Sequence, residues 1–287
     1  MKPLGDSRQV RDAGDMVGNW RGVLYPAGLP TFHRLPAPDR VAHLVRWFWI
    51  PEWHIAAGRV VRQQIIGFPA CNVVVEPEVV GLAGPTTRAS HRDLTGTGWA
   101  VGALLRPAAT PGLVEPLVGS PGALLDDYRT VQLPELHASI LATMTADADA
   151  ARRRADAVEV YTEWLSATAP PAGEEALLAN AMADLVDSDS TVVRVDQAAD
   201  ALGVSVRTLQ RLTRRYVGVS PAAMIRRRRL QESAERLRDD PDADIAAIAA
   251  DLGYADHAHL STDFRTVLGT TPATYRRAGA RSARPGT

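Results

Sequence analysis

The 287-residue sequence contains a single cysteine, Cys71, and no apolar run long enough to cross a bilayer. One cysteine excludes an intrachain disulfide and a multi-cysteine zinc site. The opening segment MKPLGDSRQV also lacks the apolar core of a secretion signal. We therefore expect a soluble, cytoplasmic protein that has no membrane partner.

Sequence motifs for catalysis and for cofactors are lacking as well. There is no G-x-S-x-G, no phosphate-binding loop and no dinucleotide fingerprint. The histidines of residues 1–190 lack the close spacing of metal ligands: His33, His43, His54, His91 and His137. Cys71 lies in the apolar stretch FPACNVVVE, which favours a small buried residue over a nucleophile. We expect no enzymatic activity, no cofactor and no metal.

The net charge of −1 conceals an uneven distribution of charge along the chain. Residues 191–287 contain 16 arginines and 11 acidic residues, whereas residues 1–190 contain 16 basic and 22 acidic residues. A basic C-terminal part behind an acidic N-terminal part indicates that only the C-terminal part meets a polyanion.

Pattern changes divide the chain into a β-rich part and a helical part. Between about 20 and 106, short apolar runs such as HLVRWFWI are separated by glycine and proline, which predicts antiparallel strands. From about 112 to 165 the pattern becomes helical. The predicted organisation is a loose segment 1–17, a β-rich domain with trailing helices 18–167, a linker 168–175, a helical domain 176–280 and a tail 281–287.

The helical part contains an internal repeat. The segments AADALGVSVRTLQRLTRRYVGVSPAAMIRR (198–227) and IAADLGYADHAHLSTDFRTVLGTTPATYRR (248–277) share an apolar helix ending in Leu-Gly, a turn and a second amphipathic helix. This pattern is typical of a helix-turn-helix unit. The prediction depends on three kinds of residue in each copy: a small residue at the helix crossing, a glycine at the turn and apolar residues of the second helix. In the first copy these are Ala199, Gly203 and Leu209, and in the second Ala249, Gly253, Leu260 and Phe264.

Residues that face away from the core in the two second helices are the candidates for reading DNA. Arginine pairs bidentately with guanine and glutamine with adenine, so such residues can read base edges. The candidates for base readout are Val206, Arg207, Gln210 and Arg211 in the first copy, and His257, Ala258, Ser261 and Thr262 in the second. We expect the more strongly charged first set to make most direct base contacts. A plain helical bundle is the alternative, but two tandem copies in a basic region favour binding of double-stranded DNA.

Residues 176–278 resemble the AraC/XylS family of transcriptional regulators. The most specific matches are LGVSVRTLQRLTRRYVGVSP, IRRRRLQESAERL, IAAIAADLGYADHAHLSTDF and GTTPATYRR. The resemblance implies seven helices, in which a linker helix holds two helix-turn-helix units against successive major-groove segments. The sequence departs from the family at Thr213, where phenylalanine is usual, and at Thr262, where a basic residue is frequent. Residues 100–127 resemble the N-terminal domains of a subset of the family, which implies a β-barrel-like sensor or dimerisation domain.

The expected fold class is α+β, with an N-terminal antiparallel β-barrel-like domain and a C-terminal all-α domain. The resemblance implies double-stranded DNA as a partner, a small-molecule effector if the first domain is a sensor, a second copy of the chain if it dimerises, and RNA polymerase if the protein is an activator. An apolar cavity in the first domain would favour sensing over a pure dimerisation module. The alternative function is an enzyme of the DNA-repair type, in which Cys71 reacts and the C-terminal domain targets DNA.

Four consecutive arginines, 226–229, lie early on the expected linker helix from Pro221 to Arg238. Since a helix turns by 100° per residue, the four side chains point in different directions and cannot share one ligand. We expect their roles to be divided between phosphate contacts and at least one internal ion pair. The candidates for phosphate contact are Arg214, Arg226, Arg227 and Arg265.

Three of the six tryptophans lie in the segment RWFWIPEWH, 46–54. Trp47, Trp49 and Trp53 are candidates for the lining of an aromatic effector pocket. The alternative, which the pattern favours, is one strand of a barrel whose aromatic rings alternate between the inner and the outer face.

Overall fold

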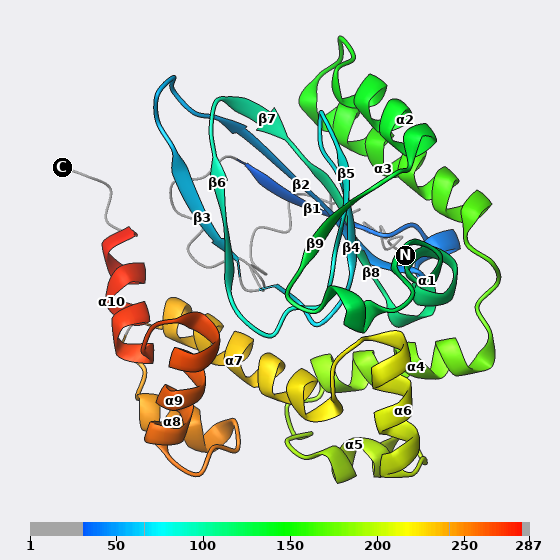
Figure 1. The fold of residues 1–287 in the computed structure, drawn as a ribbon. Helices are drawn as coiled ribbons and strands as arrows, with labels where there is room; N and C mark the ends of the chain where they lie inside the picture. The colour runs from blue at the N-terminus through cyan, green and yellow to red at the C-terminus, as the bar shows by residue number, and fades with distance from the viewer. Residues whose placement is uncertain (1–30, 66, 241, 283–287) are drawn as a thin grey trace, which may run out of the picture.

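The computed structural model describes residues 31–65, 67–240 and 242–282 (Figure 1). The expected loose segment 1–17 lies outside the described residues, as do residues 283–287 of the expected tail. The described chain forms an N-terminal part of strands and helices, followed by a C-terminal part made of helices (Figure 1). The expected α+β fold is confirmed.

Antiparallel strands build the N-terminal part. They are β1 Phe32–Pro36, β2 Val45–His54, β3 Val61–Ile65, β4 Asn72–Val75, β5 Val80–Ala83, β6 Ser90–Leu94, β7 Thr97–Trp99, β8 Val101–Leu105 and β9 Tyr128–Val131. The main sheet has the order β1-β2-β8-β4-β5-β9, with β7 paired to β2, while β3 and β6 form a separate pair. Among the described strands, β1 and β9 are opposite edges that do not pair with each other. The expected barrel-like sheet is therefore open and does not close into a barrel, and helices rather than further strands cover its core face.

The helices α2 Pro134–Met144 and α3 Ala150–Thr168 supply that cover. Phe48 and Ile50 of β2 and Val73 of β4 are fully buried in the same hydrophobic cluster as Tyr161 of α3. The ring of Tyr161 lies 5.3 Å from that of Phe48, and its hydroxyl donates a 2.9 Å hydrogen bond to the carbonyl of Val73. The core of the first domain thus lies between the sheet and this helical hairpin.

The strand β9 lies inside the stretch 112–165 that the sequence pattern predicts as helical. It pairs antiparallel with β5, which comes much earlier in the chain. Local periodicity cannot indicate such a partner, so the helical prediction is wrong at this point. The other short elements of the first domain are η1 Asp39–Val41, η2 Pro107–Ala109, η3 Thr110–Val114, α1 Glu115–Val118 and η4 Pro121–Leu124.

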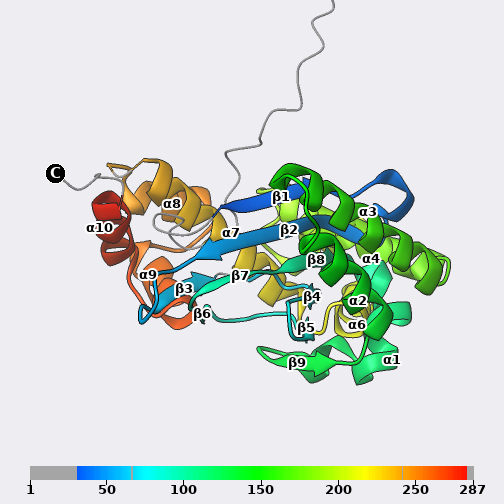
Figure 2. The same ribbon diagram turned by 90° about the horizontal axis from the view of Figure 1, so that it is seen from above.

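The C-terminal part consists of α4 Glu174–Ser188, α5 Val195–Ala201, α6 Val206–Tyr216, α7 Pro221–Asp239, α8 Ile245–Asp251, α9 His257–Leu268 and α10 Pro272–Ser282. In the view from above, α8 to α10 gather at one end of the molecule, with α4 and α6 at the other (Figure 2). The long helix α7 contributes its first half to one hydrophobic cluster and its second half to another. None of the described helices is long and apolar enough to span a membrane.

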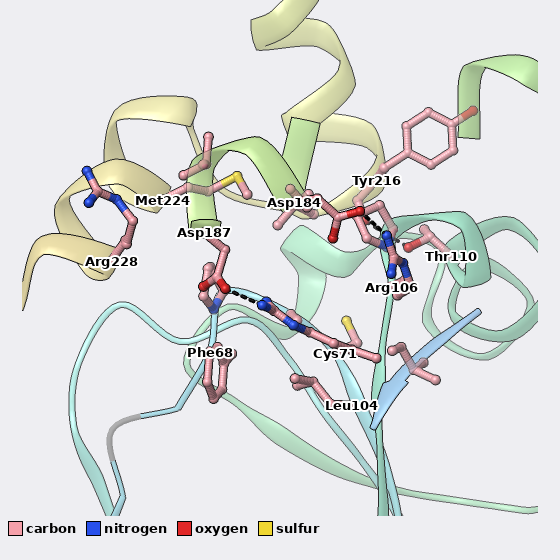
Figure 3. A pocket seen from close by; sticks show the side chains of 18 of the residues that line it. Phe68, Cys71, Leu104, Arg106, Thr110, Asp184, Asp187, Tyr216, Met224 and Arg228 are labelled. Carbon is pink, nitrogen blue, oxygen red and sulfur yellow. Dashed lines mark hydrogen bonds and ion pairs between the residues drawn. The ribbon is translucent and has the colours of Figure 1, made fainter. Parts of the chain in front are cut away.

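The helix α4 docks the C-terminal helices onto the sheet domain. Asn180 is buried, accepts a 2.9 Å hydrogen bond from the amide of Ala108 and donates a 2.8 Å bond to the carbonyl of His43. Arg46 of the first domain forms an ion pair with Asp187 of α4, and Arg106 forms one with Asp184 (Figure 3 labels Arg106 and Asp184). The expected linker 168–175 is shorter in the structure, since α3 ends at Thr168 and α4 begins at Glu174.

Candidate nucleic-acid interface

The helices α5 and α6 form the first helix-turn-helix unit. Ala199 and Leu209 are buried between the helices, and Gly203 takes a φ of 65° at the turn. The hydroxyl of Ser205 caps α6 by accepting a 3.1 Å hydrogen bond from the amide of Thr208. A glycine is favoured at this turn because a positive φ strains residues that carry a Cβ.

The helices α8 and α9 form the second unit by the same means. Ala249, Leu260 and Phe264 are fully buried, and Gly253 takes a φ of 72°. Asp256 caps α9 by accepting a 2.7 Å hydrogen bond from the amide of His259. In each unit, therefore, the second helix begins at a capping residue and is held against the first helix by buried side chains.

The slot occupied by Phe264 in the second unit holds Thr213 in the first, where the family usually has phenylalanine. Thr213 is fully buried, and its hydroxyl donates a 3.1 Å hydrogen bond to the carbonyl of Gln210 on the preceding turn. The polar atom is thus satisfied within α6, which avoids the cost of an unpaired buried hydroxyl.

The outward face of α6 carries the predicted base-reading residues in exposed positions: Val206, Arg207, Gln210 and Arg211, with Arg214 one turn further on. Arg211 and Arg215 both pair with Glu175 of α4, and the hydroxyl of Tyr216 donates a 3.0 Å bond to the same carboxylate. The hydrogen bond from Arg211, followed by that from Tyr216, lowers the pKa of the Glu175 carboxyl. Glu175 therefore restrains the Arg211 guanidinium at the edge of the reading face.

The outward face of α9 is less charged. His257, Ala258, Thr262 and Arg265 are exposed, whereas Ser261 is half-buried. The Thr262 hydroxyl donates a 2.9 Å hydrogen bond to the carbonyl of Ala258, and it can still accept another.

The four consecutive arginines of α7 have four different environments. Arg226 forms a 2.8 Å ion pair with Asp263 of α9 and keeps 43% of its side chain exposed. Arg228 donates a 2.9 Å hydrogen bond to the carbonyl of Val192, and Arg229 lies 3.7 Å above the ring of Tyr254. Arg227 is only 3% exposed, so its predicted phosphate contact is wrong: this turn of α7 faces the first domain. Phosphate contacts by Arg214, Arg226 and Arg265 stay predictions.

The three tryptophans of β2 lie on the strand face opposite to the buried Phe48. Trp47 is flanked by the guanidinium groups of Arg34 and Arg46, at 4.3 and 4.7 Å from its ring centre. The indole N–H groups of Trp49 and Trp53 donate to Asn72 and to the carbonyl of Thr95. No tryptophan lines the cavity at the junction of the sheet domain and α4, and an aromatic effector pocket at these three residues stays a prediction.

A small cavity of about 60 Å³ lies at the junction of the sheet domain and α4 (Figure 3). Phe68, Cys71 and Leu104 line it from the first domain, with Tyr216 and Met224 from the second. Burial raises the pKa of the Cys71 thiol to about 12. The arginines around this cavity have carboxylate partners: Arg46 pairs with Asp187 and Arg228 with Glu232, and Figure 3 shows Arg106 beside Asp184.

Two capped helix-turn-helix units joined by one helix define a tandem helix-turn-helix protein, and comparison with known proteins agrees. Residues 198–278 match a helix-turn-helix domain family, and residues 24–128 match a domain of unknown function (DUF6597). The C-terminal domain of the chain is therefore similar to that of AraC-like transcription regulators.

Individual relatives cover only part of the chain. The HTH-type transcriptional activator RhaS of Escherichia fergusonii is 33% identical over 102 residues, which are 36% of this chain and 36% of RhaS. A putative AraC-like transcription regulator of Streptomyces antibioticus is 34% identical over 121 residues, 42% of this chain and 38% of that protein. The solved structure of ToxT from Vibrio cholerae aligns over 86% of this chain and 95% of ToxT at 12% identity, with a TM-score of 0.39. The match to this chain spans little more than a third of the length of RhaS and of the Streptomyces antibioticus regulator.

Proposed function

We propose that the protein is a sequence-specific transcriptional regulator that binds double-stranded DNA through α6 and α9. The observation that carries this proposal is the pair of capped helices with exposed polar faces, held apart by the single helix α7. At 1.5 Å per residue, α7 is about 28 Å long, which approaches the roughly 34 Å of one DNA turn. The two helices can therefore address successive major-groove segments on one side of the duplex.

The two reading helices differ in the contacts that they can make. The exposed Arg207, Gln210 and Arg211 of α6 can form bidentate contacts with base edges. The smaller residues of α9 suit contacts with phosphates and with thymine methyl groups, and they suit recognition of DNA shape. We infer that α6 contributes most of the sequence preference.

Arg207→Ala and Arg211→Ala are each expected to weaken binding to a specific site by about 1–3 kcal/mol, roughly 5- to 150-fold. Each variant should also relax the preference at one or two base pairs, because a bidentate contact to a base edge is lost. The binding sites are obtained by genome-wide mapping of the bound protein, and affinities for them by anisotropy titration at one fixed salt concentration.

Arg152→Ala is the matched control for these variants. Arg152 is an exposed arginine of α3 that pairs with Asp156 on the same helix, away from both reading helices. Its replacement removes the same charge and should leave specific binding unchanged. Wild-type affinity and wild-type sequence preference in both Arg207→Ala and Arg211→Ala would refute base readout by α6.

The first domain is proposed to sense a small molecule, to dimerise, or to do both. Its contacts with α4 would allow a change in the first domain to alter the position of the DNA-binding helices. The name of RhaS describes that relative as an activator. If this chain is an activator too, RNA polymerase is a further partner.

An enzyme that uses Cys71 is the alternative, and the environment of the thiol speaks against it. With a pKa raised from 9.0 to about 12, the thiolate fraction at pH 8 falls roughly a thousandfold. We expect iodoacetamide to label Cys71 far more slowly in the folded chain than in the unfolded chain, as measured by mass spectrometry. Rapid labelling of the folded protein would restore the enzyme hypothesis.

A further inference from the structure

The two arginines among the base-reading candidates of α6 differ in how they are held. The Nη1 atom of Arg211 donates a hydrogen bond to Oε1 of Glu175, which lies in the first turn of α4. Arg207 is exposed and has no ion-pair partner among the described residues. The side chain of Arg207 can therefore sample many rotamers, whereas that of Arg211 is tethered to the start of α4.

The carboxylate of Glu175 is itself fixed by two further donors. Its Oε2 atom accepts a 2.8 Å hydrogen bond from Nη1 of Arg215 and a 3.0 Å bond from the hydroxyl of Tyr216. Tyr216 is only 5% exposed, and its carbonyl accepts a 2.9 Å bond from the buried hydroxyl of Thr110 in the first domain. Because Tyr216 is anchored in this way, the carboxylate has a defined position, and it holds the Arg211 side chain in place.

The bond to Glu175 leaves most of the Arg211 guanidinium available to DNA. Arginine carries five N–H donors in a planar fork, and Nε together with Nη2 forms one edge of it. Glu175 uses Nη1, and no hydrogen bond to the Nε and Nη2 edge is formed within the part of the chain that the structure describes. The side chain of Arg211 is 56% exposed. Two N–H groups on one edge are what a bidentate contact to O6 and N7 of guanine requires.

We propose that Glu175 is a specificity-determining residue, which positions Arg211 for one base pair without touching the DNA; this inference rests on the proposed function. An arginine that is already held in place contacts the correct base without a further loss of rotamer freedom. At a wrong base it cannot swing to a neighbouring phosphate, so its donors stay unpaired. Both effects widen the difference in affinity between the correct base and a wrong one.

The negative charge of Glu175 acts on overall affinity in the opposite direction. Hydrogen bonds from Arg211 and then from Tyr216 lower the pKa of the Glu175 carboxyl, so the group is ionised at neutral pH. An anion beside the reading face repels the phosphate backbone whatever the base sequence. The neighbouring Glu174 is exposed, has the same charge and forms no ion pair with the described residues. Charge alone would act alike at both positions, so base discrimination is what separates them.

The test compares Glu175→Ala with Glu174→Ala by anisotropy titration on a mapped binding site and on its single-base variants. The base pair read by Arg211 is the one whose preference is lost in Arg211→Ala, and the base pair read by Arg207 is found in the same way. We expect Glu175→Ala to reduce the preference at the Arg211 base pair by about two- to tenfold, the cost of ordering a freed side chain. The preference at the Arg207 base pair and the affinity for unrelated DNA should not fall. Glu174→Ala should leave both preferences unchanged.

Two further variants separate positioning from a general disturbance of the fold. Glu175→Gln keeps the shape of the side chain but loses the charge-assisted bond, and it should reduce the same preference by a smaller factor. In the Arg211→Ala background, Glu175→Ala should not change discrimination at that base pair, because the side chain that Glu175 positions is absent.

A wild-type preference at the Arg211 base pair in both Glu175→Ala and Glu175→Gln overturns the proposal. Equal losses at the Arg207 and Arg211 base pairs also overturn it, since they indicate that α6 as a whole has shifted. If Arg211→Ala itself keeps every preference while Arg207→Ala does not, the positioning role fails and the proposed function stands. A wild-type protein that prefers no DNA sequence would instead contradict the proposed function.

Discussion

Replacing Phe264 by alanine is expected to lower the free energy of unfolding by about 3–5 kcal/mol, the range for truncating a buried aromatic ring. Phe264 is fully buried at the centre of the second helix-turn-helix unit, and its ring lies 5.5 Å from that of Tyr275 in α10. The cluster around it is small and is separate from the core of the first unit, so few neighbours can collapse into the void. Urea denaturation followed by circular dichroism measures the loss.

The same variant should bind DNA more than tenfold more weakly, because α9 loses the packing that sets its angle. For stability, Thr262→Ala is the matched control: Thr262 lies on α9 and is exposed, and its side-chain hydroxyl donates a hydrogen bond to the carbonyl of Ala258. Its stability should change by less than about 0.5 kcal/mol. A Phe264→Ala protein as stable as Thr262→Ala would show that the second unit is not packed as described.

Gly218→Ala is expected to cost roughly 3 kcal/mol, from a strained backbone and from a collision between the domains. Gly218 follows α6 and takes a φ of 84°. A Cβ at this position would lie 2.6 Å from the amide nitrogen of Gly122 and 2.7 Å from the carbonyl carbon of Pro121. Both atoms belong to the backbone of the first domain, so the domains must move apart to accept the methyl group. Thermal and urea unfolding measure the cost.

Gly203→Ala separates the two causes. Gly203 also has a positive φ, 65°, but a Cβ there would meet nothing within 4 Å. It should therefore lose only the backbone contribution, about 1 kcal/mol. The excess cost of Gly218→Ala reports the domain contact, and equal costs for the two variants would mean that the first domain does not press on this turn.

The repeat around Gly203 and Gly253 could be predicted because its determinants are local. A cap, a glycine with positive φ and apolar residues at helical spacing act within one or two turns of the chain. The buried Leu209 and Leu260 and the capping Ser205 and Asp256 follow from those rules. The exposure of the opposite faces of α6 and α9 follows as well.

Strand pairing in the sheet domain could be predicted less completely. The strand β9 pairs with β5 although three other strands and several short helices lie between them in the chain. Whether β1 and β9 close a barrel likewise depends on strand positions that no local pattern encodes. The alternation along β2 predicts two faces, but it does not say which face the helices α2 and α3 will cover. The structure shows that Phe48 and Ile50 face the core, which leaves Trp47, Trp49 and Trp53 on the other face of the strand.

Taken by itself, the sequence determined the two-part organisation, the tandem helix-turn-helix units and their reading faces, because periodicity and capping act over a few residues. Only the tertiary structure decided the roles of the four arginines. Their positions on α7 are set by helical geometry, but their partners come from α9, from the turn before α5 and from the first domain. An arginine in a sequence is equally a phosphate contact or a buried cation, and what distinguishes them is which surface packs against that turn of the helix.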